Sequence, residues 1–244
     1  MINIFKKRPV VSSLLAACAS SFLLSSCGGP LTSSTSSGGG SLSGARKAYE
    51  DYNRPATLPT NRSNVRIKVS LSNQMAYVME GDKALLVMPV TVGKSSTPTP
   101  TGSFRIQAKE HKYRANTHGY AIKGDQVFGV KLKNKPAGYS FAGTPMPYWC
   151  SFKSGYGFHT GWMKPFPASA GCLRMHKNVA PKFFRLVSTG TPLSILSSQP
   201  EDATIGRNIP RPPDSTPFPG NPNEMMARTD DFFTQHQNPT YTNQ

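Results

Sequence analysis

A histidine and a cysteine stand close together in a stretch of glycine, proline and other small residues. His159 precedes Cys172 by thirteen positions, and the thiol sits between Gly171 and an arginine, Arg174, two positions on. A thiol becomes a strong nucleophile when a neighbouring imidazole stabilises the thiolate or takes its proton. The pair therefore indicates acyl transfer through a thioester, with Cys172 as the nucleophile and His159 as the general base.

Two further residues of this stretch could complete such a site. Gly171 permits the tight backbone that exposes a sulfur and directs peptide N–H groups towards a developing oxyanion. Ser169 lies three residues before the thiol and is a candidate to orient the imidazole. Each residue also has an ordinary structural role as an alternative, because a lone cysteine is often a small buried hydrophobic group.

The other histidines and cysteines favour neither a metal site nor a disulfide framework. Cys150 lies beside Trp149 and is expected to pack in the core, although a disulfide with Cys172 stays open as an alternative. The histidine spacings match no common zinc-ligand pattern; the histidines concerned are His111, His118, His159 and His176.

The N-terminal residues indicate export. A positive cluster at residues 6–8 precedes an apolar run over residues 10–24, which is too short and too rich in serine to span a bilayer permanently. The run ends in the letters LSSC, which resemble the lipobox of bacterial lipoproteins. That resemblance implies a signal peptide over residues 1–26 and a lipid on Cys27. The letters LAAC, ending at Cys18, are a weaker match, and an ordinary signal peptide is the remaining alternative.

The rest of the chain divides into three parts. Residues 27–62 are expected to form a tether, because its first part is dominated by Ser, Thr and Gly and cannot bury a core. Residues 63–197 are expected to fold. Residues 198–244 are polar and rich in Pro and Asn, so we expect disorder there, with Phe232 and Phe233 as an exposed pair.

Composition and periodicity predict a mainly β fold. Hydrophobic residues make up 37% of the chain and charged residues 16%, with 22 prolines and 21 glycines. Only residues 179–187 show helical spacing. We therefore expect a β-sandwich or barrel with one or two short helices. Alternation and short apolar runs predict strands near residues 65–71, 75–79, 85–92, 103–106, 120–122, 127–130, 146–152, 156–159 and 192–196.

The formal net charge of +16 predicts an acidic partner, such as an anionic membrane surface or an acidic polymer. Nucleic acid is not favoured, because the basic residues are scattered and no zinc-finger, RNP or helix-turn-helix pattern is present.

Taken together, the motifs resemble those of the L,D-transpeptidase catalytic domain family. The family signature is His-Gly, a short loop and then Ser/Thr-x-Gly-Cys-(Ile/Val/Leu)-Arg, and residues 159–175 follow it closely. Four more elements match in the same order along the chain. They are GK at 93–94, TPTGSF at 99–104, MPYW at 146–149 and GTPL at 190–193. The resemblance covers residues 65–196 or so.

This resemblance implies a role for each matching residue. Cys172 is the nucleophile and His159 the general base, while the backbone carbonyl of Ser169 orients the base. N–H groups near Gly171 form the oxyanion hole, and Arg174 supports the site and attracts a substrate carboxylate. We also expect four aromatic residues to contact the substrate: Tyr148, Trp149, Tyr156 and Trp162.

The resemblance also implies the reaction. The substrate is the peptide stem of bacterial peptidoglycan, attacked at the carbonyl before its terminal D-Ala. A second stem amine would then give a cross-link, water would give a carboxypeptidase, and a lipoprotein lysine would give an anchored protein. No metal or organic cofactor is implied. We expect a monomer, held by its lipid on an outer membrane and facing the periplasm, because glycines follow Cys27 where inner-membrane lipoproteins often have aspartate.

Two departures from the family pattern stand out. Ala170 occupies a position where many members have His, and Thr160 follows the histidine where Gly is common. A non-catalytic wall-binding lipoprotein with the same fold is the alternative function. A papain-like endopeptidase is disfavoured, because there the cysteine precedes the histidine by a long interval.

Overall fold

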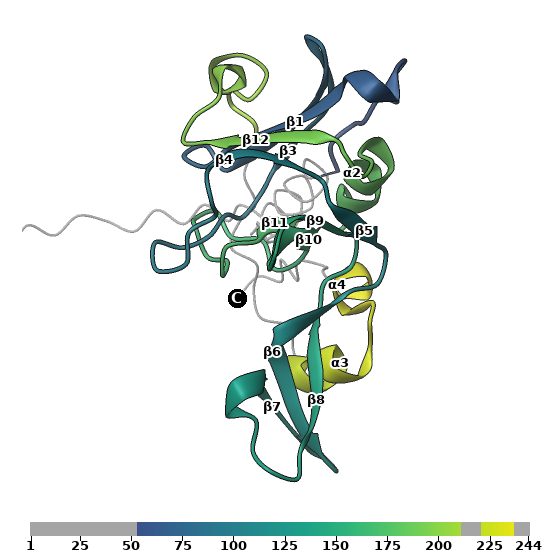
Figure 1. Ribbon diagram of the computed structural model, residues 1–244, viewed down its shortest axis with the longest axis vertical. Helices are drawn as coiled ribbons and strands as arrows, with labels where there is room; N and C mark the ends of the chain where they lie inside the picture. Colours follow the sequence, from purple (N-terminus) through teal and green to yellow (C-terminus); the bar gives the residue numbers. More distant parts are fainter. Residues whose placement is uncertain (1–52, 211–220, 237–244) are drawn as a thin grey trace, which may run out of the picture. The chain divides into compact units, whose positions relative to one another are not determined.

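The computed structural model describes residues 53–210 and 221–236. They form a mainly β fold of three sheets with a few short helices, which confirms the fold class predicted from the sequence (Figure 1). The signal peptide expected at 1–26, the lipidation site at Cys27 and most of the expected tether lie outside the described residues.

The first sheet has five strands in the order β3-β2-β1-β12-β4. In β1, Val65, Ile67 and Val69 face the core and are at most 1% exposed, whereas Arg66 is exposed, as the alternation predicts. The last strand, β12, pairs in parallel with β1, so the end of the domain returns to its beginning. The strands are β1 (Val65–Ser70), β2 (Met75–Glu80), β3 (Lys83–Pro89), β4 (Gly102–Arg105) and β12 (Pro192–Leu196).

The second sheet has the strand order β11-β10-β9-β5. β9 and β10 are antiparallel, and β11 pairs in parallel with β10. Both β5 and β11 have only three residues, too short to show an alternating pattern, and the sequence analysis missed them. The strands are β5 (Ala108–Glu110), β9 (Trp149–Lys153), β10 (Tyr156–Thr160) and β11 (Leu173–Met175).

The main core lies between these two sheets and one helix. It contains the inward residues of both sheets together with α2 (Ala180–Leu186). Val179, Phe183 and Leu186 are at most 2% exposed, so the predicted helical face is confirmed. No helix in the described residues combines the length and apolar character needed to cross a membrane.

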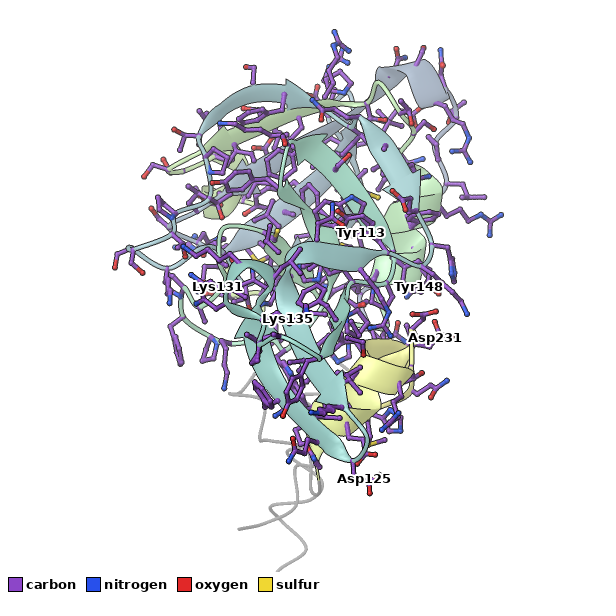
Figure 2. The ribbon with its side chains drawn as sticks, turned by 60° about the horizontal axis from the view of Figure 1, so that its bottom comes forward. Tyr113, Asp125, Lys131, Lys135, Tyr148 and Asp231 are labelled. Atoms are coloured by element: carbon purple, nitrogen blue, oxygen red, sulfur yellow. The ribbon has the colours of Figure 1, made fainter. Side chains whose placement is uncertain are left out.

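A third sheet, which we call the β6–β8 sheet, projects from this core with the order β7-β6-β8. It consists of β6 (Arg114–Lys123), β7 (Gln126–Lys131) and β8 (Ser140–Pro145), and the short helix η2 (Leu132–Asn134) follows β7. Asp125 marks its tip and Tyr113 stands at its base (Figure 2). The register between β6 and β8 shifts between Arg114 and Gly119, so residues 115–118 have no regular partner in β8, although His118 still pairs with Lys131 of β7.

The expectation of a tether up to residue 62 is wrong for residues 53–62. Ala56 forms a β-bridge with Leu86, and the N–H of Thr57 donates to the carbonyl of Leu85 at 2.8 Å. β3 is the outermost strand of its sheet, and its unpaired backbone groups favour an additional partner. The short helix η1 (Arg62–Asn64) then leads into β1.

The expectation of disorder after residue 198 is also wrong for most of that segment. Helix η3 (Pro200–Ala203) places Asp202 against β2, where the hydroxyl of Tyr77 donates to its carboxylate at 2.6 Å. Further on lie α3 (Pro222–Arg228) and α4 (Phe232–Gln235), in which Phe232 and Phe233 are at most 3% exposed. The polar composition hid these helices, because their few apolar residues are buried against distant parts of the chain. Residues 211–220 and 237–244 lie outside the description.

Candidate active site

Strand alternation places three chemically active side chains on one face of the second sheet. Phe158 lies opposite Leu173 across the β10–β11 pair, and both are fully buried in the core. Their neighbours His159 and Arg174, which also lie opposite each other, therefore point to the other face. Cys172 directly precedes Leu173 and shares this face. The thiol, the imidazole and the guanidinium group thus come from two adjacent strand ends.

The loop between β10 and β11 carries the thiol, and the segment that follows β3 holds it in place. The carbonyl of Ser169 accepts hydrogen bonds from the N–H of Lys94 and the hydroxyl of Thr97, both at 3.1 Å. The hydroxyl of Thr99 donates to the carbonyl of Gly171 at 2.8 Å. The motifs that begin at residues 93 and 99 therefore fix the loop that presents the cysteine.

Gly171 occupies a backbone conformation that only glycine adopts readily. Its φ is +113°, in the left-handed region that other residues rarely enter. A Cβ at this position would also lie 2.6 Å from a ring carbon of Tyr156. The glycine is thus required both by the turn before the thiol and by the aromatic ring packed behind it.

We expect Gly171→Ala to destabilise the fold by at least about 2 kcal/mol, because it combines backbone strain with a steric clash. Urea unfolding measures the loss, and the rate of Cys172 alkylation should change with it because the turn carries the thiol. Gly129→Ala is the matched control, since nothing lies within 4 Å of a Cβ there. Equal stability of the two variants would contradict this reading of the turn.

His159 is held in one tautomer by its neighbour in the sequence. Its Nδ1 lies 2.6 Å from the carbonyl oxygen of Thr160. A carbonyl only accepts, so Nδ1 carries the hydrogen and Nε2 keeps the lone pair that can take a proton. Thr160 is in turn fixed by its N–H and its hydroxyl, which donate to the carbonyl of Pro147 at 3.0 and 3.2 Å. This contact explains the position of the motif at residues 146–149.

Two roles expected from the sequence are therefore corrected. Thr160, not Ser169, provides the carbonyl that orients His159. Ser169 instead braces the loop, because its hydroxyl donates to the carbonyl of Cys172 at 2.6 Å. The N–H of Gly171 donates to the same hydroxyl oxygen at 3.0 Å, so it is already engaged and is not directed at an oxyanion.

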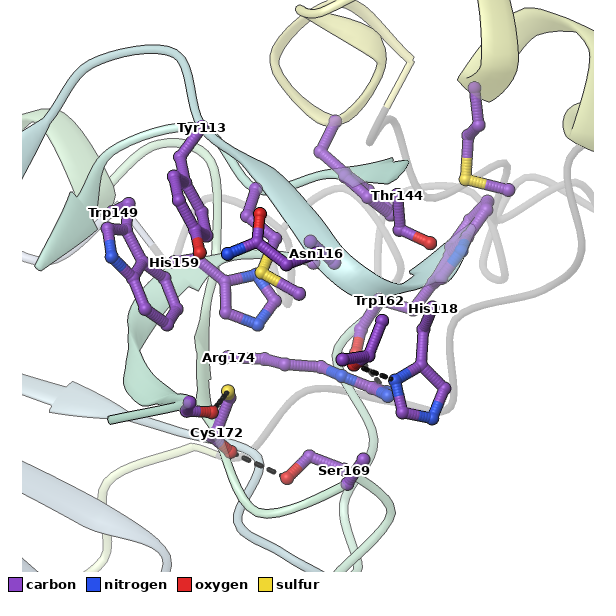
Figure 3. Close-up of a pocket in the computed structure, with 18 of the residues that line it drawn as sticks. Tyr113, Asn116, His118, Thr144, Trp149, His159, Trp162, Ser169, Cys172 and Arg174 are labelled. Atoms are coloured by element: carbon purple, nitrogen blue, oxygen red, sulfur yellow. Dashed lines mark hydrogen bonds between the residues drawn. The ribbon is translucent and has the colours of Figure 1, made fainter. Parts of the chain in front are cut away.

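The three active side chains open into one cavity of about 520 Å³. Figure 3 shows the sulfur of Cys172, the imidazole of His159 and the side chain of Arg174 facing this space. The thiol is partly exposed, whereas His159 is only 6% exposed. The cavity is lined by Tyr113, Ala115, Asn116, Thr117, His118, Tyr120, Thr144, Met146, Trp149, Ser154, Gly155, His159, Gly161, Trp162, Ser169, Ala170, Cys172, Arg174, Met226 and Phe233.

Burial keeps both members of the cysteine–histidine pair neutral near pH 7. Burial, together with the charge of Arg174, lowers the pKa of His159 to about 4, despite the opposing hydrogen bond to Thr160. Burial also raises the pKa of the Cys172 thiol, although a backbone hydrogen bond from Gly157 and the charge of Arg174 oppose this rise. The resting pair is therefore a thiol beside a neutral imidazole, and the imidazole can accept the thiol proton as the sulfur attacks.

Cys150, the other cysteine in the described part of the chain, has a different environment. It is fully buried in the main core, and burial raises the pKa of its thiol to about 12. Both cysteines are free, so the disulfide alternative is excluded. Cys150 is the packed residue that the sequence analysis expected.

Two of the four expected substrate-contacting aromatic residues line the cavity, and two do not. Trp149 does so and stacks on Tyr113, with ring centroids 4.6 Å apart; Trp162 lines it as well. Tyr148 turns away, with a positive φ of 58° and its ring against His111 and Phe184. Tyr156 packs behind Gly171 against the core, so neither tyrosine side chain is placed to contact a ligand in this cavity.

Several lining residues were missed by the sequence analysis. Tyr113, Asn116 and His118 come from the start of the β6–β8 sheet, where residues 115–118 are not regularly paired with β8 and line the cavity. No motif marks them, because a shift of strand register leaves no sequence signal. Within the described residues, no group of three or more His, Cys, Asp or Glu side chains could hold a metal ion.

The fold and the site thus define a mainly β domain with a cysteine, a histidine and an arginine in one cleft. Comparison with known proteins specifies the class further. Residues 64–195 match the family model of the L,D-transpeptidase catalytic domain. The chain belongs to this family.

Relatives of this chain come from several bacteria. One relative is a Bacillus licheniformis protein that is named as an L,D-transpeptidase, YkuD. It is 30% identical to this chain over 146 residues, which cover 58% of this chain and 68% of that protein. Among solved structures, an L,D-transpeptidase from Stackebrandtia nassauensis has a TM-score of 0.41 and 20% identity, over 59% of this chain and 60% of that one. L,D-transpeptidase 1 of Mycobacterium tuberculosis has a TM-score of 0.39 and 22% identity, over 55% and 61%. This chain therefore spans only three fifths of the length of these structures.

Proposed function

We propose that this protein is a cysteine acyltransferase that acts on the peptide stems of bacterial peptidoglycan, as an L,D-transpeptidase. The observation that carries the proposal is the opening of Cys172 and the oriented imidazole of His159 into a single cavity. Membership of the family supplies the substrate class. The acceptor of the acyl group is left to experiment.

In the first half of the proposed reaction, Nε2 of His159 takes the thiol proton while the sulfur of Cys172 attacks the carbonyl before the terminal D-Ala. The C–N bond then breaks, and the imidazolium returns the proton to the departing amine. The stem is left as a thioester on Cys172. In the second half, an amine or a water molecule attacks the thioester, the same imidazole takes its proton, and the thiol is restored.

Arg174 has a supporting role in this proposal. One of its guanidinium nitrogens donates to the carbonyl of Trp162 at 3.3 Å, which ties the end of β11 to the loop after β10. Its positive charge stabilises a thiolate on Cys172 and attracts a carboxylate of the stem. Arg174→Ala should therefore slow turnover without abolishing it.

The proposal includes export and a lipid on Cys27, with the domain facing the periplasm from the outer membrane. Its support is the N-terminal sequence, with a basic cluster, an apolar run and the letters LSSC. A lipid anchor would keep the domain close to the peptidoglycan layer, which raises its effective concentration at the substrate.

Incubation of the purified protein with tetrapeptide-stem muropeptides, followed by mass spectrometry, tests the proposal. We expect release of the terminal D-Ala, and the mass of the other product identifies the acceptor. A dimer indicates a stem amine, and a tripeptide stem indicates water. No change in the muropeptides, alone or with an added lysine-bearing peptide as acceptor, would favour the non-catalytic alternative.

A further inference from the structure

The helices α3 and α4 contribute directly to the cavity that contains Cys172. Met226 of α3 and Phe233 of α4 line this cavity, although they follow Cys172 by more than fifty positions in the sequence and lie outside the residues that the family model matches. Both side chains are buried, at 6% and 3% exposure. The two helices lie beside the β6–β8 sheet (Figure 1), and α3 contacts all three of its strands.

Polar contacts fasten this pair of helices at the base of the β6–β8 sheet. The guanidinium group of Arg114, the first residue of β6, contacts the carboxylate of Asp230 at 2.6 Å and the carbonyl of Met226 at 3.1 Å. Lys112 pairs with Asp231 at 3.2 Å. Asp231 begins α4 close to Tyr148, at the end of the sheet away from its tip at Asp125 (Figure 2). The contacts are therefore concentrated next to residues 115–118, where the regular pairing of β6 with β8 is interrupted.

Apolar contacts join the same helices to the loop after β10. The ring of Trp162 packs edge-on against Phe232 and Phe233, with centroid distances of 5.8 and 5.7 Å. Met226 contacts the hydroxyl of Tyr120 through its sulfur at 3.2 Å. Trp162 follows β10, the strand that contains His159, whereas Tyr120 belongs to β6. The helices α3 and α4 therefore join the two sides of the cavity.

We propose that α3 and α4 are part of the active site. They hold the β6–β8 sheet over Cys172, and Met226 and Phe233 form an apolar wall that limits the size of the group able to enter the cavity that contains the thiol. Because the wall is apolar, the group that it contacts is an uncharged, aliphatic part of the substrate. The inference rests on the proposed function in so far as this cavity is the substrate site, but its tests need no turnover.

The first test measures access to the thiol with two reagents of different size. Cys172 is alkylated with iodoacetamide and with a fluorescein-bearing iodoacetamide, and mass spectrometry of the peptide that contains Cys172 gives both rates. Phe233→Ala removes the wall and leaves space, so we expect the ratio of the large to the small reagent's rate to rise about fivefold or more. Phe233→Leu should largely restore the ratio of the unmodified protein.

The matched control is Gln235→Ala, which changes an exposed residue of the same helix. We expect its ratio to equal that of the unmodified protein. An unchanged ratio in Phe233→Ala would overturn the proposal. So would an equal rise in both alanine variants, because that would indicate general loosening of the helix.

The second test leaves Met226 and Phe233 in place and removes the ion pairs that hold α3 and α4 to the base of the β6–β8 sheet. The variant Asp230→Asn with Asp231→Asn removes both ion pairs, and we expect amide hydrogen exchange in residues 114–123 to become about three- to tenfold faster. Exchange in β1 and β10 should stay as it was, which shows that the core remains folded. Unchanged exchange in residues 114–123 would show that α3 and α4 do not hold the sheet. Since neither test depends on catalysis, the failure of either is distinguishable from failure of the proposed function.

Discussion

Replacing Cys172 by alanine should abolish D-Ala release from a tetrapeptide stem, with a loss of about a thousandfold or more. Nothing else in the described cavity offers a thiol, and the only other cysteine described, Cys150, is buried in the core. The variant should fold normally, because the sulfur of Cys172 makes only weak contacts with the backbone, one of them a long one of 3.6 Å to the carbonyl of Gly155 and another to Gly157. Chromatographic assay of released D-Ala measures the effect, and urea unfolding checks the fold.

Cys150→Ala is the matched control for the thiol. It should keep full activity and lose about 1 kcal/mol of stability, since a small buried group leaves a small cavity. Loss of activity in Cys172→Ala and loss of stability alone in Cys150→Ala would distinguish the reactive cysteine from the packed one. Full activity of Cys172→Ala, or loss of activity in a folded Cys150→Ala, would refute the assignment of the nucleophile.

Replacing His159 by glutamine should lower kcat/KM at pH 7 by about 100- to 10,000-fold, because the variant loses the imidazole whose Nε2 is kept free, by the hydrogen bond at Nδ1, to take the thiol proton. The two proteins should also differ in their pH dependence. Burial lowers the pKa of His159 to about 4, so the unmodified protein should keep its activity as pH falls through the ordinary value of 6.5 and lose it only towards pH 4. The variant depends on spontaneous ionisation of a thiol whose pKa burial raises, so its residual activity should increase as the pH rises.

His111→Gln serves as the control for the imidazole. His111 is exposed, and its ring packs on Tyr148 outside the cavity. We expect its pH profile and rate to match those of the unmodified protein. An acid limb of the unmodified protein centred near pH 6.5, or equal losses in both histidine variants, would contradict the role given to His159.

The sequence predicted the reactive pair and most strands of the first two sheets because their signals are local. In β1, for example, the apolar residues Val65, Ile67 and Val69 alternate with polar ones in the sequence, and all three are buried in the structure. Cys172 and His159 are close in sequence, and the pairing of β10 with β11 keeps them close in the fold. Short-range patterns of this kind need no knowledge of the remaining chain.

The group that orients the imidazole of His159 could not be predicted from local sequence patterns. A backbone carbonyl orients His159, and every residue has one, so residue type gives no information about which carbonyl is used. Thr160 was noted only because Gly is common at its position in the family, whereas its carbonyl makes the contact with the imidazole. Ser169 was expected to provide the orienting carbonyl because it matches the family motif, but in the structure that carbonyl accepts from Lys94 and Thr97, and the Ser169 hydroxyl braces the loop.

The apolar wall of the cavity could not be predicted from the sequence, for a different reason. Met226 and Phe233 lie in a segment whose composition resembles a disordered tail, and their burial depends on Tyr120 and Trp162, distant in sequence. A few apolar residues can order a polar segment when a partner surface already exists. Composition alone cannot indicate that such a surface is present.

The central claim is that a thiol activated by His159 forms a covalent acyl intermediate inside the cavity. The most direct test is incubation of the protein with a carbapenem, followed by intact mass and peptide mapping. We expect one adduct, located on Cys172, formed slowly in His159→Gln and not at all in Cys172→Ala. An adduct on another residue, or no adduct on a folded protein, would contradict it.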